Sequence, residues 1–361
     1  MSVRHDVHST RYSTEEIVMS TLRKKIAQML IIGFPEAEIH AKSPVVEWLQ
    51  SDGLGGVLLF DYNMQARSFG KNLKTREQIQ HLNAQLRQFN MQDLPLFIAI
   101  DYEGGAVDRL KHIEGCRATI TPLEQAHLSS DALRVEINAM AKTLADLGFN
   151  LNFSPVVDLN LNDQLGIIGK LGRSFSSLPQ RVIEVASASV RGFNEYGIVC
   201  CYKHFPGHGS AVGDTHEGFV DVTDTYHPTE LEPYATLVQD PQQAMIMTAH
   251  VINRHLDPSG LPATLSYPIL TGLLREELGY KGVIISDDLQ MQAISHHYSL
   301  EESLRLTINA GADMVIFGNQ LGEHTATEVI DCIENLVDSG DIKRSRIEEA
   351  FQRIVTLKKA K

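Results

Sequence analysis

The chain has little cysteine and no excess of basic residues, and each shortage argues against a class of protein. Its 361 residues include only four cysteines, Cys116, Cys200, Cys201 and Cys332, and none has the C-x-x-C spacing of a metal site. Cys200 and Cys201 lie in one apolar run, so we expect small buried thiols in a reducing compartment. The formal net charge of -13 argues against nucleic-acid binding, because neutralising phosphates requires a basic face.

Long apolar runs are also missing. The first residues, Met1 to Glu16, are polar and mixed in charge, without an apolar signal segment. No run elsewhere is long enough to span a bilayer. We therefore expect a cytoplasmic protein that has no membrane partner.

Short apolar runs, in contrast, recur along the chain, and each leads into a polar loop and then an amphipathic stretch. Continuous Val, Ile and Leu runs that alternate with helices indicate a parallel sheet covered by helices. Eight runs favour a closed (β/α)8 barrel of the TIM type over a doubly wound sheet. The runs are Ala27–Phe34, Gly56–Phe60, Leu96–Asp101, Phe149–Leu159, Ile198–Phe205, Ala244–Val251, Val283–Asp287 and Met314–Gly318.

The amphipathic stretches between the runs predict the helices. No repeat, low-complexity tract or Pro/Ser linker marks off a second domain, so residues 1–361 are expected to form one barrel domain. Residues 1–13 are expected to form a flexible arm. The predicted helices include Thr75–Gln88, Asp131–Leu147, Pro179–Tyr196, Tyr267–Leu278, Leu300–Ala310 and a closing helix at Arg344–Lys358.

Polar clusters fall where the apolar runs end. Asp101-Tyr-Glu-Gly-Gly105 follows the third run, Lys203 and His204 end the fifth, His250 lies at the end of the sixth, and Asp287 ends the seventh. In barrels of this class, chemistry takes place at the carboxyl ends of the strands. Scattered structural charges would have no reason to prefer that edge, so the pattern predicts an enzyme.

Asp287 and Asp288 end the seventh run as adjacent carboxylates. Alternation along a strand places them on opposite sides, so only one is expected to face the barrel mouth. The simpler interpretation is that they cap a helix beginning near Leu289. Two carboxylates at the end of a buried strand exceed what a cap needs, and we favour a functional role for one.

A glycine-rich loop follows the fifth run and contains Asp214-Thr-His216. Two residues apart in extended backbone, Asp214 and His216 point the same way, and the carboxylate can fix the imidazole tautomer and raise its basicity. Such a histidine can protonate a leaving group and later deprotonate water. The competing interpretation is a surface loop with an incidental histidine.

A zinc site is a second interpretation of the histidines, since zinc binds neutral imidazoles. Pro206 and Gly207 interrupt any helix that would align His204 with His208. His208 and His250 are more simply hydrogen-bonded loop and strand-end residues. We therefore expect no metal.

The remaining candidates are Asp101, Arg109, Arg173 and Lys203. Cations at or beside the end of an apolar strand are costly unless they are paired or bind substrate. The planar fork of Arg173 suits sugar hydroxyls or a carboxylate. Asp313, between a helix end and the last strand, is expected to be structural.

Taken together, these motifs resemble the glycoside hydrolase family 3 β-N-acetylglucosaminidases, especially the single-barrel bacterial type involved in peptidoglycan recycling. The resemblance runs from about Leu22 to the final helix. The motifs that carry it are Pro95-Leu-Phe-Ile-Ala-Ile-Asp-Tyr-Glu-Gly-Gly105, Asn152-Phe-Ser-Pro-Val-Val-Asp158, Gly172-Arg-Ser-Phe175, Lys203-His-Phe-Pro-Gly-His-Gly209, Asp214-Thr-His216 and Ser286-Asp-Asp-Leu289.

The resemblance implies a role for each candidate. Asp287 would be the nucleophile, and His216 the acid/base with Asp214 as its partner. The reaction would be retaining hydrolysis of terminal non-reducing β-linked N-acetylglucosamine from muropeptide fragments, without metal or cofactor, by a monomer or weak homo-oligomer. The implied sugar-contacting residues are Asp101, Arg109, Arg173, Lys203 and His204.

The chain departs from the family pattern in two places. Ala106 stands where the family usually has arginine, although Arg109 is retained, and the loop Glu217–Val222 differs from commoner versions. A family 3 β-glucosidase or xylosidase would take its acid/base from a second domain, for which this chain has no residues left. Phosphorolysis, a zinc-dependent amidohydrolase-like barrel and a barrel that has lost catalysis also stay open as interpretations of the sequence.

Overall fold

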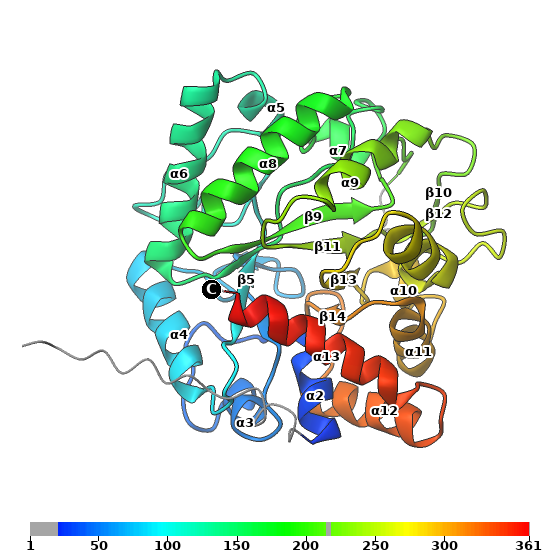
Figure 1. Cartoon of the computed structure of the whole chain (residues 1–361). Coiled ribbons are helices and arrows are strands. Elements are labelled where there is room, and N and C mark those ends of the chain that lie inside the picture. The colour runs from blue at the N-terminus through cyan, green and yellow to red at the C-terminus, as the bar shows by residue number, and fades with distance from the viewer. Residues whose placement is uncertain (1–20, 214–217, 361) are drawn as a thin grey trace, which may run out of the picture.

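Eight parallel strands form a closed barrel in the computed structural model, which describes residues 21–213 and 218–360. Around the barrel the order is β1-β14-β13-β11-β9-β8-β5-β2, and β1 closes the ring by pairing with both β14 and β2. Each strand coincides with one of the eight predicted runs, and only β13 extends past its run, by one residue, which confirms the (β/α)8 prediction (Figure 1). The strands are β1 (Leu30–Ile32), β2 (Gly56–Leu58), β5 (Phe97–Ile100), β8 (Leu151–Asn152), β9 (Val199–Phe205), β11 (Ala244–Thr248), β13 (Ile284–Asp288) and β14 (Met314–Phe317).

Helices cover the outside of the barrel (Figure 1). The predicted helices are present, except that the stretch from Tyr267 forms a π-helix, η3 (Pro268–Glu277). Within the described part of the chain, no helix combines the length and apolar character needed to cross a membrane. The longer helices are α2 (Leu22–Gln28), α3 (Pro44–Gln50), α4 (Arg76–Phe89), α6 (Ser130–Leu147), α8 (Pro179–Glu195), α9 (Glu232–Leu237), α11 (Leu300–Ala310), α12 (Ala326–Asp338) and α13 (Arg344–Lys359); the shorter ones are α5 (Pro122–Gln125), α7 (Ile167–Lys170), η1 (Pro228–Leu231), η2 (Ala263–Leu265) and α10 (Gln292–Ser295).

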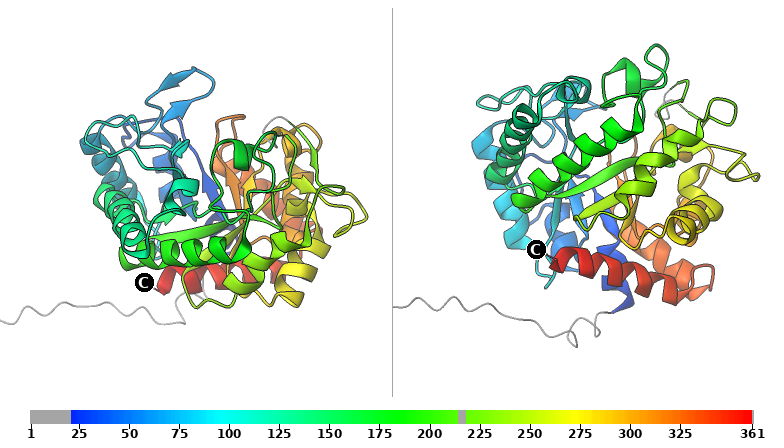
Figure 2. Two further views of the ribbon diagram at one scale, coloured as in Figure 1. Left: turned by 90° about the horizontal axis from the view of Figure 1, so that it is seen from above. Right: turned by 45° about the horizontal axis from the view of Figure 1, so that its top comes forward.

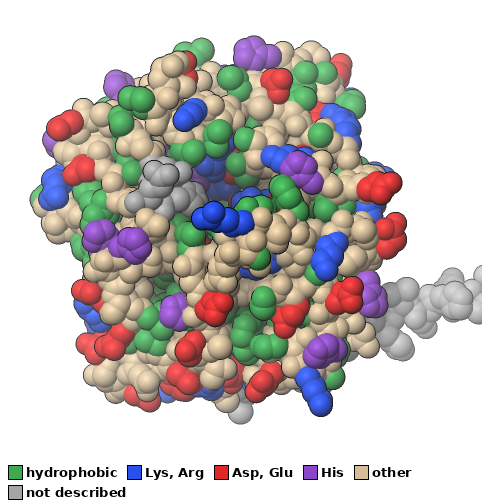
Figure 3. Space-filling model, turned by 180° about the vertical axis from the view of Figure 1, so that it is seen from behind, with side chains coloured by type: hydrophobic (Ala, Val, Ile, Leu, Met, Phe, Trp, Pro, Cys, Tyr) green, Lys and Arg blue, Asp and Glu red, His purple; other side chains and the backbone are tan. Residues whose placement is uncertain are grey.

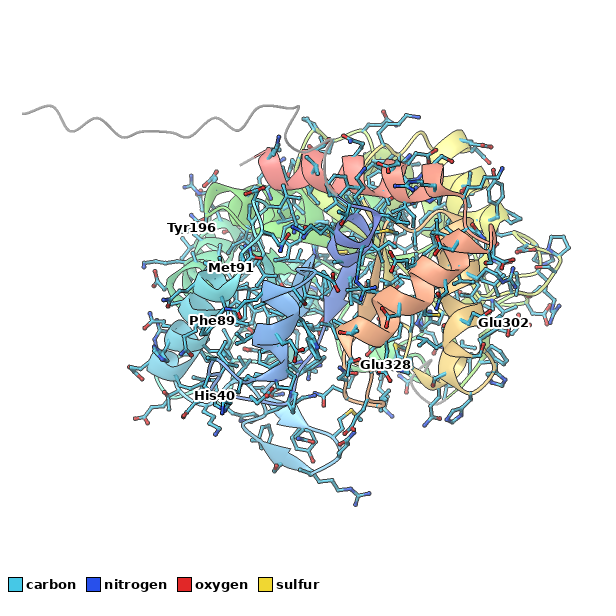
Figure 4. All side chains as sticks on the ribbon, turned by 90° about the horizontal axis from the view of Figure 1, so that it is seen from below. His40, Phe89, Met91, Tyr196, Glu302 and Glu328 are labelled. Atoms are coloured by element: carbon cyan, nitrogen blue, oxygen red, sulfur yellow. The ribbon has the colours of Figure 1, made fainter. Side chains whose placement is uncertain are left out.

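Polar side chains at the helix ends explain where several helices begin. Thr325 precedes α12, where its hydroxyl accepts from the Glu328 N–H at 3.1 Å and its own N–H donates to the Glu328 carboxylate at 2.8 Å. Ser299 accepts similarly from the Glu302 N–H before α11. Figure 4 labels Glu302 and Glu328, both exposed, in the first turns where negative charge complements the helix dipole.

Three small sheets extend the loops at the carboxyl ends of the barrel strands. The hairpin β3 (Tyr62–Asn63) and β4 (Ser68–Phe69) follows β2, and β6 (Tyr102–Gly104) with β7 (Val107–Asp108) follows β5. β10 (Val220–Asp221) pairs in parallel with β12 (Val251–Ile252). Figure 2 (left) shows the β3–β4 hairpin projecting beyond the rest of the fold. The predicted arm, residues 1–13, lies outside the described residues.

A buried aspartate connects the closing helix to the barrel at the amino ends of the strands, opposite to the loops just described. The Asp313 carboxylate is fully buried and forms ion pairs with Arg275 at 2.5 Å, Arg346 at 2.5 Å and Arg353 at 3.0 Å. It also accepts from the Ile284 N–H at 3.0 Å. One side chain therefore connects η3 and α13 to the start of β13, in the structural position expected for it.

Replacing Asp313 by alanine should destabilise the fold strongly, because three partly buried arginines would lose their shared carboxylate. We expect the free energy of unfolding to fall by about 3–5 kcal/mol, measured by chemical denaturation. Glu349→Ala is the matched control, because this carboxylate contacts two of the same arginines from an exposed position. Its effect should be below about 1 kcal/mol. Equal losses in the two variants would contradict the assignment.

Candidate active site

Two adjoining cavities open at the carboxyl ends of the barrel strands. Their volumes are about 530 and 260 Å³, and the larger is also lined by Glu103, Arg173, His204 and His208. Figure 3 looks onto this end of the molecule and shows a hollow with Lys and Arg side chains within and around it. The side chains that line both cavities are Met64, Asp101, Arg109, Asp287 and Leu321.

Asp287 lies at the end of β13, where the two cavities meet. Its N–H donates to Thr248 Oγ1 at 3.3 Å, and its Oδ1 accepts from the Asp288 N–H at 2.8 Å. These bonds fix the backbone and one carboxylate oxygen at the cavity floor. Asp287 thus occupies the strand-end position that the sequence predicted.

The expectation that only one of Asp287 and Asp288 faces the mouth was wrong. Both line the smaller cavity, although only Asp287 also reaches the larger one. The pairing of β13 with β14 shifts register between Ile285 and Asp288, so regular alternation fails at this point. The capping interpretation was also wrong: Asp288 Oδ1 accepts from the Gln290 N–H at 3.0 Å in a turn, and α10 begins at Gln292.

Beneath the larger cavity, Glu103 brings two predicted residues together. Arg173 donates to it through Nε and Nη2, both at 2.8 Å, and Lys203 Nζ lies 2.7 Å from Oε1. Lys203 also donates to Asp101 Oδ1 at 3.0 Å. Asp101, Arg173 and Lys203 therefore form one ion network, centred on a carboxylate for which the sequence predicted no role.

The network determines the charge of its members. Burial alone would raise the pKa of Glu103, but Arg173 and Lys203 outweigh it and hold that pKa well below the ordinary range. Burial would lower the pKa of Lys203, and Glu103 and Asp101 outweigh this and raise it. Both groups are therefore ionised at neutral pH. The spacing of Asp101 and Glu103, two residues apart, was the available signal for Glu103.

His204 is oriented by a second buried carboxylate, Asp158. Its Nδ1 lies 2.7 Å from Asp158 Oδ2, and the N–H groups of His204 and His208 also donate to Asp158. Burial would raise the pKa of Asp158, but His204 outweighs it and keeps that pKa low. The bond at Nδ1 leaves Nε2 as the ring nitrogen of His204 available to the cavity. Asp158 ends one of the family motifs, but its role was missed.

His208 and His250 differ from each other. His250 is held by Thr264 Oγ1 at 2.7 Å from Nδ1 and by the Asp288 carbonyl at 2.9 Å from Nε2, as expected for a hydrogen-bonded strand-end residue. Burial, with the nearby charge of His204, lowers the pKa of His208 to about 4, so its ring is neutral. Its backbone N–H donates to Asp158, as expected of a hydrogen-bonded loop residue, whereas its Nδ1 has no hydrogen-bond partner among the described residues.

Arg109 reaches across the mouth from the loop after β7. Its Nη1 lies 3.5 Å from Asp61 Oδ1, its Nη2 lies 3.9 Å from Asp101 Oδ2, and the guanidinium packs over the Phe60 ring. Asp61 was not predicted, although it directly follows the second apolar run. Nearby, Ala106 is exposed, and its carbonyl accepts from an exposed lysine, Lys111, at 3.2 Å. The absent arginine side chain therefore leaves no buried gap.

Asp214 and His216 lie outside the described residues, so the structure does not place them. The chain reaches them from Gly213 and is next described from Gly218. Before this segment, His208 lines the larger cavity; after it, Phe219 stacks on His297 with ring centroids 3.7 Å apart. Among residues 21–213 and 218–360, no group of three His, Cys, Asp or Glu side chains has the arrangement of a metal site.

Replacing Glu103 by glutamine should alter the acid stability of the protein. The folded pKa of Glu103 lies below its ordinary value of 4.5, so its charge stabilises the fold above that pH and the contribution is lost as pH falls. We expect the wild-type melting temperature to exceed that of Glu103→Gln at neutral pH, and the gap to narrow progressively as pH falls below about 5. Exposed Glu195→Gln is the control and should show no such pH-dependent gap. A gap for Glu103→Gln that is constant with pH would contradict the network.

Comparison with known proteins agrees with this architecture. A sequence model of the glycosyl hydrolase family 3 N-terminal domain matches residues 21–357. β-Hexosaminidase A of Pseudoalteromonas piscicida is 32% identical over 330 residues, covering 84% of this chain and 53% of that protein, so the chain spans about half its length. The β-hexosaminidase of Tolumonas auensis is 34% identical over 293 residues, covering 80% of this chain and 82% of that protein.

Solved structures show the same relationship. A family 3 β-N-acetylglucosaminidase from a Paenibacillus species superposes with a TM-score of 0.83 at 32% identity, covering 94% of this chain and 62% of that one. A family 3 member from Mycobacterium smegmatis gives a TM-score of 0.80 at 28% identity, covering 94% and 98%. With the family model matching nearly the whole chain, the protein belongs to glycoside hydrolase family 3.

Proposed function

We propose that the protein is a retaining exo-β-N-acetylglucosaminidase with Asp287 as its nucleophile. The observation that carries the proposal is the position of Asp287 at the floor of a cavity that also contains Asp101, Arg109 and Arg173. A carboxylate on a rigid strand end, beside several hydrogen-bonding groups, suits attack on a bound sugar. The names of the relatives, β-hexosaminidase and β-N-acetylglucosaminidase, support the substrate class.

The reaction would be a double displacement. An Asp287 oxygen forms a bond to the anomeric carbon while the glycosidic C–O bond breaks, and His216 supplies the proton that the leaving oxygen takes up. His216, now neutral, then removes a proton from the water that attacks the same carbon, and Asp287 is released. Asp214, two residues before His216, would hold its imidazole in the required tautomer. None of these steps requires a metal or an organic cofactor.

The polar side chains that line the larger cavity would hold the sugar while it is bound to Asp287. His204, Asp101 and Arg109 line the cavity and differ in their donor and acceptor properties, and the hydroxyl groups of a pyranose can both donate and accept. Lys203 and Arg173 are held in place by ion pairs with Glu103. Their role would therefore be to position Asp101, which Lys203 also binds, and to supply fixed positive charge beside the cavity. A pre-formed wall of this kind lowers the ordering cost of binding.

The natural substrate would be a cell-wall fragment in the cytoplasm that ends in N-acetylglucosamine. Among the described residues all four cysteines are free, and Cys200 and Cys201 are fully buried, which agrees with a reducing compartment.

Product analysis in phosphate buffer distinguishes hydrolysis from phosphorolysis, since only phosphorolysis yields the sugar 1-phosphate.

Replacing Asp287 by asparagine tests the nucleophile. We expect kcat on an aryl N-acetylglucosaminide to fall by about 10⁴-fold or more, because the amide cannot form the covalent intermediate. Asp288→Asn, the adjacent carboxylate, should lose far less. Mass spectrometry of wild-type protein treated with a fluorinated N-acetylglucosaminide should place the trapped sugar on Asp287. A label elsewhere, or faster turnover of the aryl glucoside, would refute the proposal.

Replacing His216 by alanine tests the acid/base. A leaving group that departs readily as an anion needs little protonation, whereas a sugar alkoxide needs much. The kcat/KM of His216→Ala should therefore fall by about 10²–10⁴-fold for a disaccharide, and much less for a dinitrophenyl N-acetylglucosaminide. Equal losses on both substrates would show that His216 is not the proton donor. His227→Ala, a histidine before η1, is a control that should leave both rates unchanged.

A further inference from the structure

Apolar side chains surround the mouth of the candidate site. Met64 in the β3–β4 hairpin is 49% exposed, and Leu321 in the loop after β14 is 37% exposed. Figure 3 shows hydrophobic side chains close to the hollow at this end of the molecule. Clustered apolar exposure beside a cavity is typical of a binding surface rather than of ordinary protein exterior. Further exposed apolar side chains on neighbouring strand-end loops are Phe69, Leu161, Leu165, Leu171, Val212 and Phe219.

Met64 and Leu321 differ from the other rim residues because they line both cavities together with Asp287. They approach from two loops that are more than 250 residues apart in sequence, after β2 and after β14. Their apolar surfaces are thus continuous with the floor where the proposed chemistry takes place. A molecule bound at Asp287 and extending outwards would pass these two side chains.

The structure holds this pair in place. Gln320 Nε2 donates to the Tyr62 carbonyl at 2.7 Å, and its Oε1 accepts from the Met64 N–H at 3.4 Å. One side chain therefore ties the hairpin to the loop that carries Leu321. The rings of Tyr62 and Phe69 contact across the hairpin, with centroids 5.1 Å apart. A surface held in this way is ready for a ligand without further ordering.

A buried lysine adds a second tie between the same two loops. Lys71, just after the hairpin, donates from Nζ to the Asn319 carbonyl at 2.5 Å and to Gln320 Oε1 at 3.3 Å. Burial, opposed in part by Asp288, lowers the pKa of Lys71 to about 8, so it is mostly charged at neutral pH. The pair Met64 and Leu321 is therefore supported from below by polar bonds and presents apolar surface outwards.

We propose that Met64 and Leu321 form the subsite for the leaving-group sugar and receive the apolar face of a second pyranose ring. The inference rests on the proposed function, because the leaving oxygen lies on the side of the anomeric carbon opposite to the nucleophile. With Asp287 on the floor, that side faces the rim. A pyranose presents C–H groups on its faces and hydroxyls at its edge, and apolar side chains suit such a face. The occupant is therefore the second sugar of a β-linked amino-sugar disaccharide or longer chain.

Two substrates separate this subsite from the rest of the site. N,N′-diacetylchitobiose places a sugar in the leaving-group position, whereas N-acetyl-β-glucosaminyl fluoride leaves it empty. We expect Met64→Ala and Leu321→Ala each to lower kcat/KM for the disaccharide by about tenfold, the effect of losing roughly 50 Å² of apolar contact. For the fluoride, kcat/KM should stay within about twofold of wild type.

Met91→Ala is the matched control. Met91 is 67% exposed, follows α4, and lies away from the hairpin in Figure 4. Its removal should change neither rate. Equal losses on disaccharide and fluoride, or no loss on the disaccharide, would overturn the subsite while leaving the proposed function intact. A wild-type protein that cleaved neither substrate would instead refute the proposed function, and the subsite with it.

Discussion

The site depends on one buried carboxylate, Glu103, and on the two cations that neutralise it. Its side chain is fully enclosed, and an isolated charge there would be very costly. Arg173 lies in the loop after β8 and Lys203 lies in β9, so their pairing with Glu103 joins three parts of the barrel mouth. Removing either the carboxylate or one of its cations leaves an uncompensated charge under the cavity. The three side chains therefore stabilise the site only when all of them are present.

The network also explains how a site rich in charges keeps its members ionised. Lys203 is shared between Glu103 and Asp101, and each carboxylate stabilises the ammonium that burial alone would disfavour. A similar arrangement orients His204, where Asp158 binds Nδ1 and backbone N–H groups together. In both cases a deep carboxylate orients a residue that lines the larger cavity, Arg173 beside Glu103 and His204 beside Asp158. The site thus has two layers, a supporting layer of buried carboxylates and an upper layer that, under the proposed function, would meet the sugar.

Sequence reasoning recovered the barrel because its signal is local. Each strand coincides with a short apolar run, and only β13 extends past its predicted range, by one residue. The upper layer of the site was also predictable, because Asp101, His204 and Asp287 lie where such runs end. Glu103 and Asp158 were missed because the partners that give them their roles, Arg173 and His204, lie 70 and 46 residues away in sequence. Alternation failed at Asp288 because the register shift depends on pairing with β14.

The floor of the site, which barrel strands form, is under a stricter structural constraint than the rim, which loops form. This division suits a hydrolase. Asp287 and Lys203 project from barrel strands, whose positions are fixed by pairing on both sides. Met64 and Leu321 lie on loops that Gln320 and Lys71 connect. Loops tolerate substitution and insertion, whereas barrel strands do not. Ala106, which stands where the family usually has arginine, is exposed and lies in one of the strand-end loops, where substitutions are tolerated. Under the proposed function, the preference for a leaving group would therefore vary with these loops while the position of Asp287 stays constant.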